Sequence, residues 1–142
     1  MIPSIMHYNT LCLNKGLTRL YAETVFIEPC VYCGQPADSI DHIPPRSLRS
    51  FLPEIGLVAK EQEVHACREC NCVLGARPIL TIGERRAFVK LWLKKRYRKY
   101  LHIPSWTQTD LAELSPTLRK YVERGLTMQY FIKQRLQWPN TH

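Results

Sequence analysis

The spacing of apolar residues along the chain changes near residue 79. Before that point, apolar residues come in short runs that turn residues separate. Residues 39–43 alternate as in a strand, and the run "EVHACRECNCVLG" predicts a second strand followed by a short helix that Gly75 and Pro78 end. Residues 46–62 between them predict a connecting loop or a short helix. The first half of the chain is therefore expected to hold a small sheet and one helix.

After residue 79 the apolar residues recur at helical spacing. Thr81 and Glu84 have the T-x-x-E spacing of a capping box, which predicts a long helix over residues 84–101. Its apolar stripe consists of Phe88, Val89, Trp92, Leu93, Tyr97 and Tyr100. A serine followed by proline at 115–116 predicts the start of another helix, and residues 126–138 predict a further one. An additional helix is expected over residues 17–25.

Composition and charge indicate the class of protein and of partner. With 45% hydrophobic and 23% charged residues, the 142-residue chain is typical of a folded globular protein. No apolar run approaches the roughly 20 residues that a membrane span needs. The first residues lack the basic segment and apolar block of a secretory signal, so we expect a cytoplasmic protein. The net charge of +8 favours a polyanionic partner, above all nucleic acid.

Two CxxC pairs provide the strongest chemical signal in the sequence. Cys30 and Cys33 form the first pair, and Cys67 and Cys70 form the second. Zinc prefers four ligands in a tetrahedron and binds thiolates well, and two tight turns can direct four sulfurs at one ion. The alternatives are two unrelated thiol pairs or one redox-active pair. We expect a structural zinc, with no open position for a substrate.

The cysteine pairs and the residues near them resemble one known family. The segment "CVYCGQPADSIDHIPP" followed by "VHACRECN" is similar to the HNH endonucleases that carry a four-cysteine zinc, from about residue 30 to 75. The resemblance implies a ββα-metal finger, which has two antiparallel strands and a helix around a divalent cation. The expected fold class is α+β. We expect the chain to divide into three parts: a partly helical extension (1–29), an HNH zinc module (30–78) and a basic helical region packed on that module (79–142).

The resemblance also implies roles for individual residues. His42 matches the general base that activates water, while Asp41 and Asn71 match the ligands of a catalytic cation, Mg²⁺ or Mn²⁺. These residue types suit that chemistry, because neutral imidazole accepts a proton near pH 7 and oxygen ligands suit a hard cation. Gln62 stands where the family has its middle asparagine and is the candidate for orienting His42, with His65 as the alternative.

Basic residues suggest how DNA would be held. Residues 84–100 contain eight lysines and arginines and one acidic residue. Five side chains are candidate phosphate contacts: Arg46, which follows the first strand, and Arg86, Lys90, Lys94 and Arg98, spaced by four. A solvated face is the alternative for these charges.

The sequence thus predicts a metal-dependent HNH endonuclease that hydrolyses DNA, with DNA preferred over RNA on family grounds. Two departures from the family affect this prediction: Gln62 in place of the middle asparagine, and Leu74 where many relatives have lysine. Two alternatives remain open. One is a non-catalytic zinc module that binds nucleic acid. The other is an inhibitor or adaptor that binds a protein partner, or a further copy of itself, through the C-terminal helices.

Overall fold

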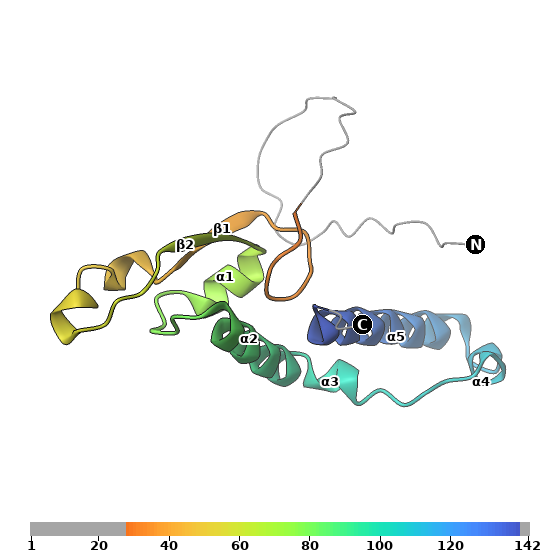
Figure 1. Cartoon of the computed structure of the whole chain (residues 1–142). Coiled ribbons are helices and arrows are strands. Elements are labelled where there is room, and N and C mark those ends of the chain that lie inside the picture. Colours follow the sequence, from red (N-terminus) through yellow and green to blue (C-terminus); the bar gives the residue numbers. More distant parts are fainter. Residues whose placement is uncertain (1–27, 140–142) are drawn as a thin grey trace, which may run out of the picture.

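The computed structural model describes residues 28–139, so the helix predicted over residues 17–25 lies outside the described part. The described chain is a mixed α+β fold with a small two-stranded sheet and a helical C-terminal part (Figure 1). In chain order, its elements are β1 (Ser39–Ile43), η1 (Arg46–Leu48), η2 (Pro53–Ile55), β2 (Gln62–Ala66), α1 (Arg68–Leu74), α2 (Ile82–Arg96), α3 (Arg98–Leu101), α4 (Gln108–Ala112) and α5 (Pro116–Gln137).

The sheet is an antiparallel hairpin of β1 and β2, as the alternating residues predicted. Its connection contains two short 3₁₀ turns, η1 and η2. The register pairs Asp41 with Val64, His42 with Glu63, and Ile43 with Gln62. Because side chains alternate along a strand, Asp41 and Ile43 face the interior and are buried, whereas His42 faces the other side and is half-buried.

The long basic helix expected over residues 84–101 is divided in the structure. It begins at Thr81, whose side chain accepts a hydrogen bond from the backbone N–H of Glu84, as the capping motif predicted. It ends after Arg96, because Tyr97 leaves helical geometry with φ −108° and ψ 20°. The Tyr97 hydroxyl donates to the Glu69 carboxylate of α1, and α3 follows as one further turn. The basic segment therefore consists of two helices, α2 and α3, that meet at Tyr97.

The C-terminal part differs from its prediction in two ways. The two helices expected from 115 and over 126–138 are one continuous helix, α5, which runs through Gly125. The short helix α4 was not predicted, although Thr107 and Asp110 form a complete capping box at its start. A helix of five residues is too short to show the repeating apolar pattern from which the other helices were predicted, so its capping box was not recognised.

One core joins the cysteine pairs to the helices. It includes Leu74 of α1 with Val89 and Leu93 of α2, and Leu136 of α5 packs against it. Ile132 of α5 is also fully buried. Helix α2 contacts both α1 and α5, and α3 packs along α5 (Figure 1). The C-terminal helices, the alternative protein-binding surface, therefore direct Val89, Leu93, Ile132 and Leu136 into an internal core.

Candidate metal centre and the adjoining hollow

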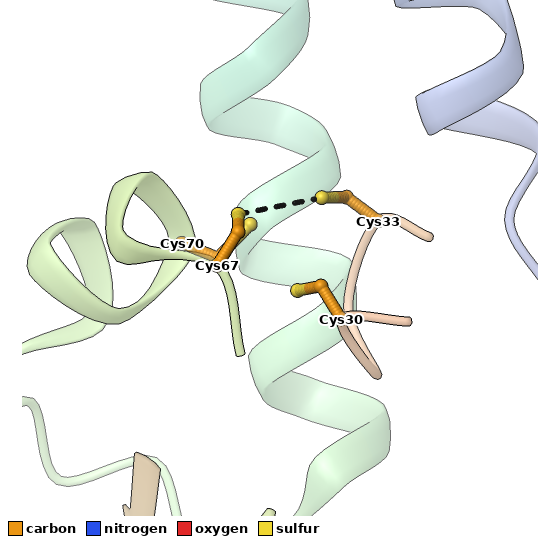
Figure 2. A group of neighbouring side chains, drawn as sticks. All are labelled: Cys30, Cys33, Cys67 and Cys70. Carbon is orange, nitrogen blue, oxygen red and sulfur yellow. Dashed lines mark hydrogen bonds between the residues drawn. The ribbon is translucent and has the colours of Figure 1, made fainter. Parts of the chain in front are cut away.

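The four cysteines of the two CxxC pairs lie together in the interior. Cys30 and Cys33 come from the turn before β1, Cys67 is the N-cap of α1, and Cys70 lies in its first turn. Their sulfurs all lie within 4.8 Å of one another, and all four side chains are buried. Figure 2 shows the two pairs facing each other across a small space, with the Cys33 and Cys67 sulfurs 3.7 Å apart.

This geometry fits a zinc ion. Four sulfurs at about 2.3 Å from zinc, in a tetrahedron, stand about 3.8 Å from one another. Hydrogen bonds from Cys33, Cys67 and Cys70 lower the pKa of the Cys30 thiol, whereas hydrogen bonds to Cys30 and Cys33 raise the pKa of Cys67 and of Cys70. The positive charge of a metal ion would favour the thiolate form of all four. The four cysteines could thus hold a zinc ion, with no ligand position left for a substrate.

Arg135 of α5 reaches the cysteine cluster, which the sequence reasoning missed. Its Nη2 lies 3.6 Å from the sulfur of Cys33 and 4.0 Å from that of Cys70, and it pairs with Glu69 at 2.5 Å. Burial lowers the pKa of this guanidinium, but the charges of Cys33 and Glu69 outweigh burial and raise it. A zinc with four thiolates has a net negative charge, which Arg135 offsets. One signal in the sequence could have indicated this contact: Arg135 stands among the apolar residues of 126–138, on the side of the helix that was expected to face the core.

Asp41 is held by a buried ion pair. Arg85 of α2 donates from Nε and Nη2 to its two carboxylate oxygens, both at 3.0 Å, and the Tyr32 hydroxyl donates at 2.5 Å. All three side chains are buried. Burial raises the pKa of Tyr32, and the hydrogen bond to the Asp41 carboxylate raises it further. With its charge neutralised by a guanidinium, Asp41 does not fit the role of a cation ligand in this arrangement.

Asn71 lies on α1 beside the first strand, where the sequence placed it. Its amide nitrogen donates to the Ser39 hydroxyl at 3.2 Å and to the Ile40 carbonyl at 3.1 Å. These bonds tie α1 to the edge of β1, and they orient the amide. The residue has a structural role in the arrangement seen, and its role as a cation ligand stays a prediction.

His42 faces Glu63 rather than Gln62. Its Nδ1 lies 3.2 Å from Oε1 of Glu63, its cross-strand partner, without the alignment of a hydrogen bond. Gln62 pairs with Ile43 and shares the opposite face of the sheet with Asp41. The structure therefore does not bring Gln62 to His42, which corrects the prediction that Gln62 orients the base. His65 pairs with Ile40, one position further along the same face as His42.

A hollow of about 290 Å³ lies where β1 meets α1 and η1. His42, Asn71 and Arg46 all line it, together with part of Asp41. Thus four of the residues predicted from sequence gather around one concave surface.

The predicted phosphate contacts on the basic helix separate into two kinds. Arg86 donates from Nε and Nη2 to the Val31 carbonyl at 3.1 and 3.0 Å, which ties α2 to the first cysteine turn. Lys90 is half-buried, whereas Lys94 and Arg98 are exposed. Arg86 therefore has a structural partner, and the exposed charges are concentrated toward the end of α2 and in α3.

Comparisons with known proteins give a short resemblance. No family model matches the chain, and no solved structure matches it. A stretch of 66 residues, 46% of the chain, is 33% identical to a mitochondrial DNA mismatch repair protein MutS homolog of Sarcophyton glaucum. The chain spans only 7% of that relative's length. Within residues 28–139, no helix combines the length and apolar character that a membrane span requires.

Proposed function

We propose that the protein is an HNH-type nuclease that hydrolyses phosphodiester bonds in DNA. The observation that supports this most is the hollow that His42, Asn71 and Arg46 share beside the cysteine cluster. These residues come from β1, α1 and η1, and the hairpin and α1 bring them together. A zinc at the four cysteines would hold the first turn and α1 in place, and so fix the wall of the hollow.

His42 acts as the general base. In this mechanism Glu63, whose Oε1 lies 3.2 Å from Nδ1 of His42, aligns with that nitrogen and keeps the proton on it, which leaves Nε2 free to accept a proton. Water attacks the phosphorus and gives its proton to Nε2 of His42, while the bond from phosphorus to the leaving oxygen breaks and that oxygen takes a proton from solvent. Glu63 positions the imidazole in this mechanism, in the role that was expected of Gln62.

Arg46 binds the phosphate at the mouth of the hollow, because a guanidinium matches the oxygens of a phosphodiester. The family resemblance implies Mg²⁺ or Mn²⁺ as well, which would stabilise charge on the phosphate. Because Asp41 is paired with Arg85, no step above depends on the cation. DNA is the proposed substrate for two reasons. The chain is strongly basic, and the protein that matches 66 of its residues is named as a DNA mismatch repair protein.

A plasmid-nicking assay tests this function. Supercoiled plasmid is incubated with the zinc-loaded protein and Mg²⁺, Mn²⁺ or EDTA, beside the variants His42→Ala and Glu63→Gln. His102→Ala is the matched control, since His102 is an exposed histidine at the end of α3. We expect His42→Ala to lose at least about 100-fold in rate and Glu63→Gln about tenfold, with the control unchanged. Equal nicking by wild type and His42→Ala would refute the proposal.

A second candidate is a non-catalytic zinc module that binds DNA. The buried pair of Asp41 and Arg85 favours it, because this pair neutralises the carboxylate that a catalytic cation would use. Under this alternative, wild-type protein binds DNA but produces no nicks with any cation. The same assay, with DNA binding measured in parallel, therefore separates the two candidates.

A further inference from the structure

A second concave surface lies at the C-terminal end of the fold, apart from the hollow at His42. It is a groove of about 450 Å³ between α5 and the segment that joins α3 to α4. Its residues include Lys99, Tyr100, Trp106, Tyr121, Arg124 and Gly125. In Figure 1, the hairpin and α4 lie at opposite ends of the molecule. None of these residues belongs to the site proposed for hydrolysis.

The groove is built into the fold rather than left by a loose loop. The side chain of Gln129 donates to the Ile103 carbonyl at 2.8 Å, which attaches the connecting segment to α5. At Gly125 a Cβ atom would come within 2.8 Å of Ile103 Cδ1, so the absence of a side chain lets the two segments approach. The capping box of Thr107 and Asp110 fixes the far end of the segment. The groove is therefore preformed.

Its chemistry combines aromatic rings with positive charge. Tyr121 is 76% exposed, so its ring is available to a ligand, and Trp106 is half-buried. Lys99 Nζ lies 4.8 Å from the centre of the Tyr100 ring, and Arg124 is exposed on α5. Among the residues that the structure describes, none that lines the groove is acidic. Aromatic platforms beside cations are what single-stranded nucleic acids require, because unpaired bases stack and phosphates pair with the charges.

We propose that this groove binds an unpaired nucleotide of single-stranded DNA. The base stacks on Tyr121 and Trp106, and the flanking phosphates pair with Lys99 and Arg124. A base in a duplex has both faces covered by its neighbours and cannot make this contact. The groove therefore gives the protein a preference for DNA with unpaired bases. This binding does not depend on hydrolysis at His42, so each proposal can fail without the other.

Fluorescence anisotropy with labelled oligonucleotides tests the groove in the full-length, zinc-loaded protein. The probes are a 12-nucleotide oligothymidine, an abasic strand of the same length and a 12-base-pair duplex. Tyr121→Ala removes a stacking side chain from an exposed position, so folding is preserved. Tyr130→Ala is the matched control, because Tyr130 is 67% exposed on the same helix and does not line the groove.

We expect Tyr121→Ala to weaken oligothymidine binding by roughly 5- to 150-fold, as loss of one stacked base would. Its binding of the duplex and the abasic strand should match wild type, and Tyr130→Ala should match wild type on all probes. Tyr121→Phe should retain oligothymidine binding. Equal affinities of Tyr121→Ala and Tyr130→Ala for oligothymidine would overturn the proposal, and so would an equal loss on the abasic strand.

Discussion

Asp41 and His42 are neighbours in sequence, but alternation along β1 gives them different surroundings. Asp41 is turned inward to Tyr32 and Arg85, whereas His42 is turned to Glu63 and the hollow. The family resemblance treats both residues as parts of one active site. The structure shows the carboxylate to be part of the interior, so that its first contribution is to the stability of the fold.

The Asp41–Arg85 pair leads to a stability prediction. Arg85→Met removes the guanidinium and leaves the Asp41 carboxylate buried without its counter-charge. We expect the free energy of unfolding at pH 7 to fall by about 3–5 kcal/mol, measured by urea denaturation of the zinc-loaded protein. Arg96→Met, at an exposed position of the same helix, should change it by less than about 0.5 kcal/mol. Similar effects of both variants would mean that the pair is dispensable.

Tyr32 predicts a loss of stability at alkaline pH. Its pKa in the folded protein is raised above the ordinary value of 10.0 by burial and by Asp41. A raised pKa contributes stability that is fully present below pH 10 and is lost as the pH rises above it. Tyr32→Phe cannot ionise, so its urea midpoint should fall less steeply between pH 9 and about pH 11 than that of wild type. Tyr130→Phe is the exposed control, and a slope of Tyr32→Phe equal to that of wild type would contradict the prediction.

The sequence predicted which residues lie near one another better than it predicted which side chains pair. The positions of His42, Asn71 and Arg46 around one hollow follow from a motif that gives their order and spacing. Gln62 and Glu63 could not be distinguished, because a shift of one residue in register exchanges the two faces of a strand. Arg85 was counted only as part of a basic run, since nothing in the sequence of α2 shows which charge faces inward.

At the scale of elements, the cysteine turns and α5 form one unit. The CxxC spacing was sufficient to predict the cluster, because each pair is local and needs only a tight turn. The continuity of α5 was not predicted, because the sequence was taken to start a separate helix near residue 126. Gly125 lies inside α5, and a glycine within a helix costs only about 1 kcal/mol. That continuity carries Arg135 to the cysteines from a helix that also forms the aromatic groove.

Zinc content tests the cysteine cluster directly. The purified protein should contain about one zinc per chain by elemental analysis, because four thiolates complete one tetrahedral site. Strong chelation should abolish the cooperative thermal transition, since metal binding contributes to folding free energy. Cys70→Ser should lower zinc retention, whereas Cys72→Ser, at an exposed cysteine of the same helix, should not. Full zinc content in Cys70→Ser would contradict a four-cysteine site.

Arg135 predicts that α5 influences metal retention. Arg135→Met removes a buried positive charge beside Cys33 and Cys70 and leaves Glu69 without its ion pair. We expect zinc transfer to a colorimetric chelator to be at least about tenfold faster than in wild type, a typical effect of losing a contact around metal ligands. Lys133→Met, at an exposed position of α5, is the control. An unchanged transfer rate would show that the guanidinium packs beside the cluster without stabilising the bound metal.

For the whole molecule, the distribution of positive charge matters more than its total. The basic run of residues 84–100 predicts one charged surface, but Arg85 is fully buried and Arg86 donates to the Val31 carbonyl. The exposed charges are concentrated in residues 94–99. The last of them, Lys99, also lines the aromatic groove. The sequence could predict the number of charges, but not which of them the core uses. DNA contacts are therefore expected at the end of α2 and in α3.

This arrangement predicts how salt affects DNA binding. Each phosphate contact on a duplex releases counterions. The plot of log affinity against log salt therefore becomes less steep by about 0.9 for every contact that is removed. Lys94→Gln and Arg98→Gln should each weaken duplex binding and reduce this slope by about one, measured by anisotropy between about 50 and 200 mM salt. Lys133→Gln is the control on α5.

Arg86→Gln separates charge on a surface from charge within the fold. It removes the two hydrogen bonds to the Val31 carbonyl, so it should lower the free energy of unfolding by about 1–3 kcal/mol. Under conditions where the variant is folded, its salt slope should equal that of wild type. A reduced slope for Arg86→Gln with unchanged stability would place the DNA along the whole of α2, and would restore the continuous basic face that the spacing by four predicted.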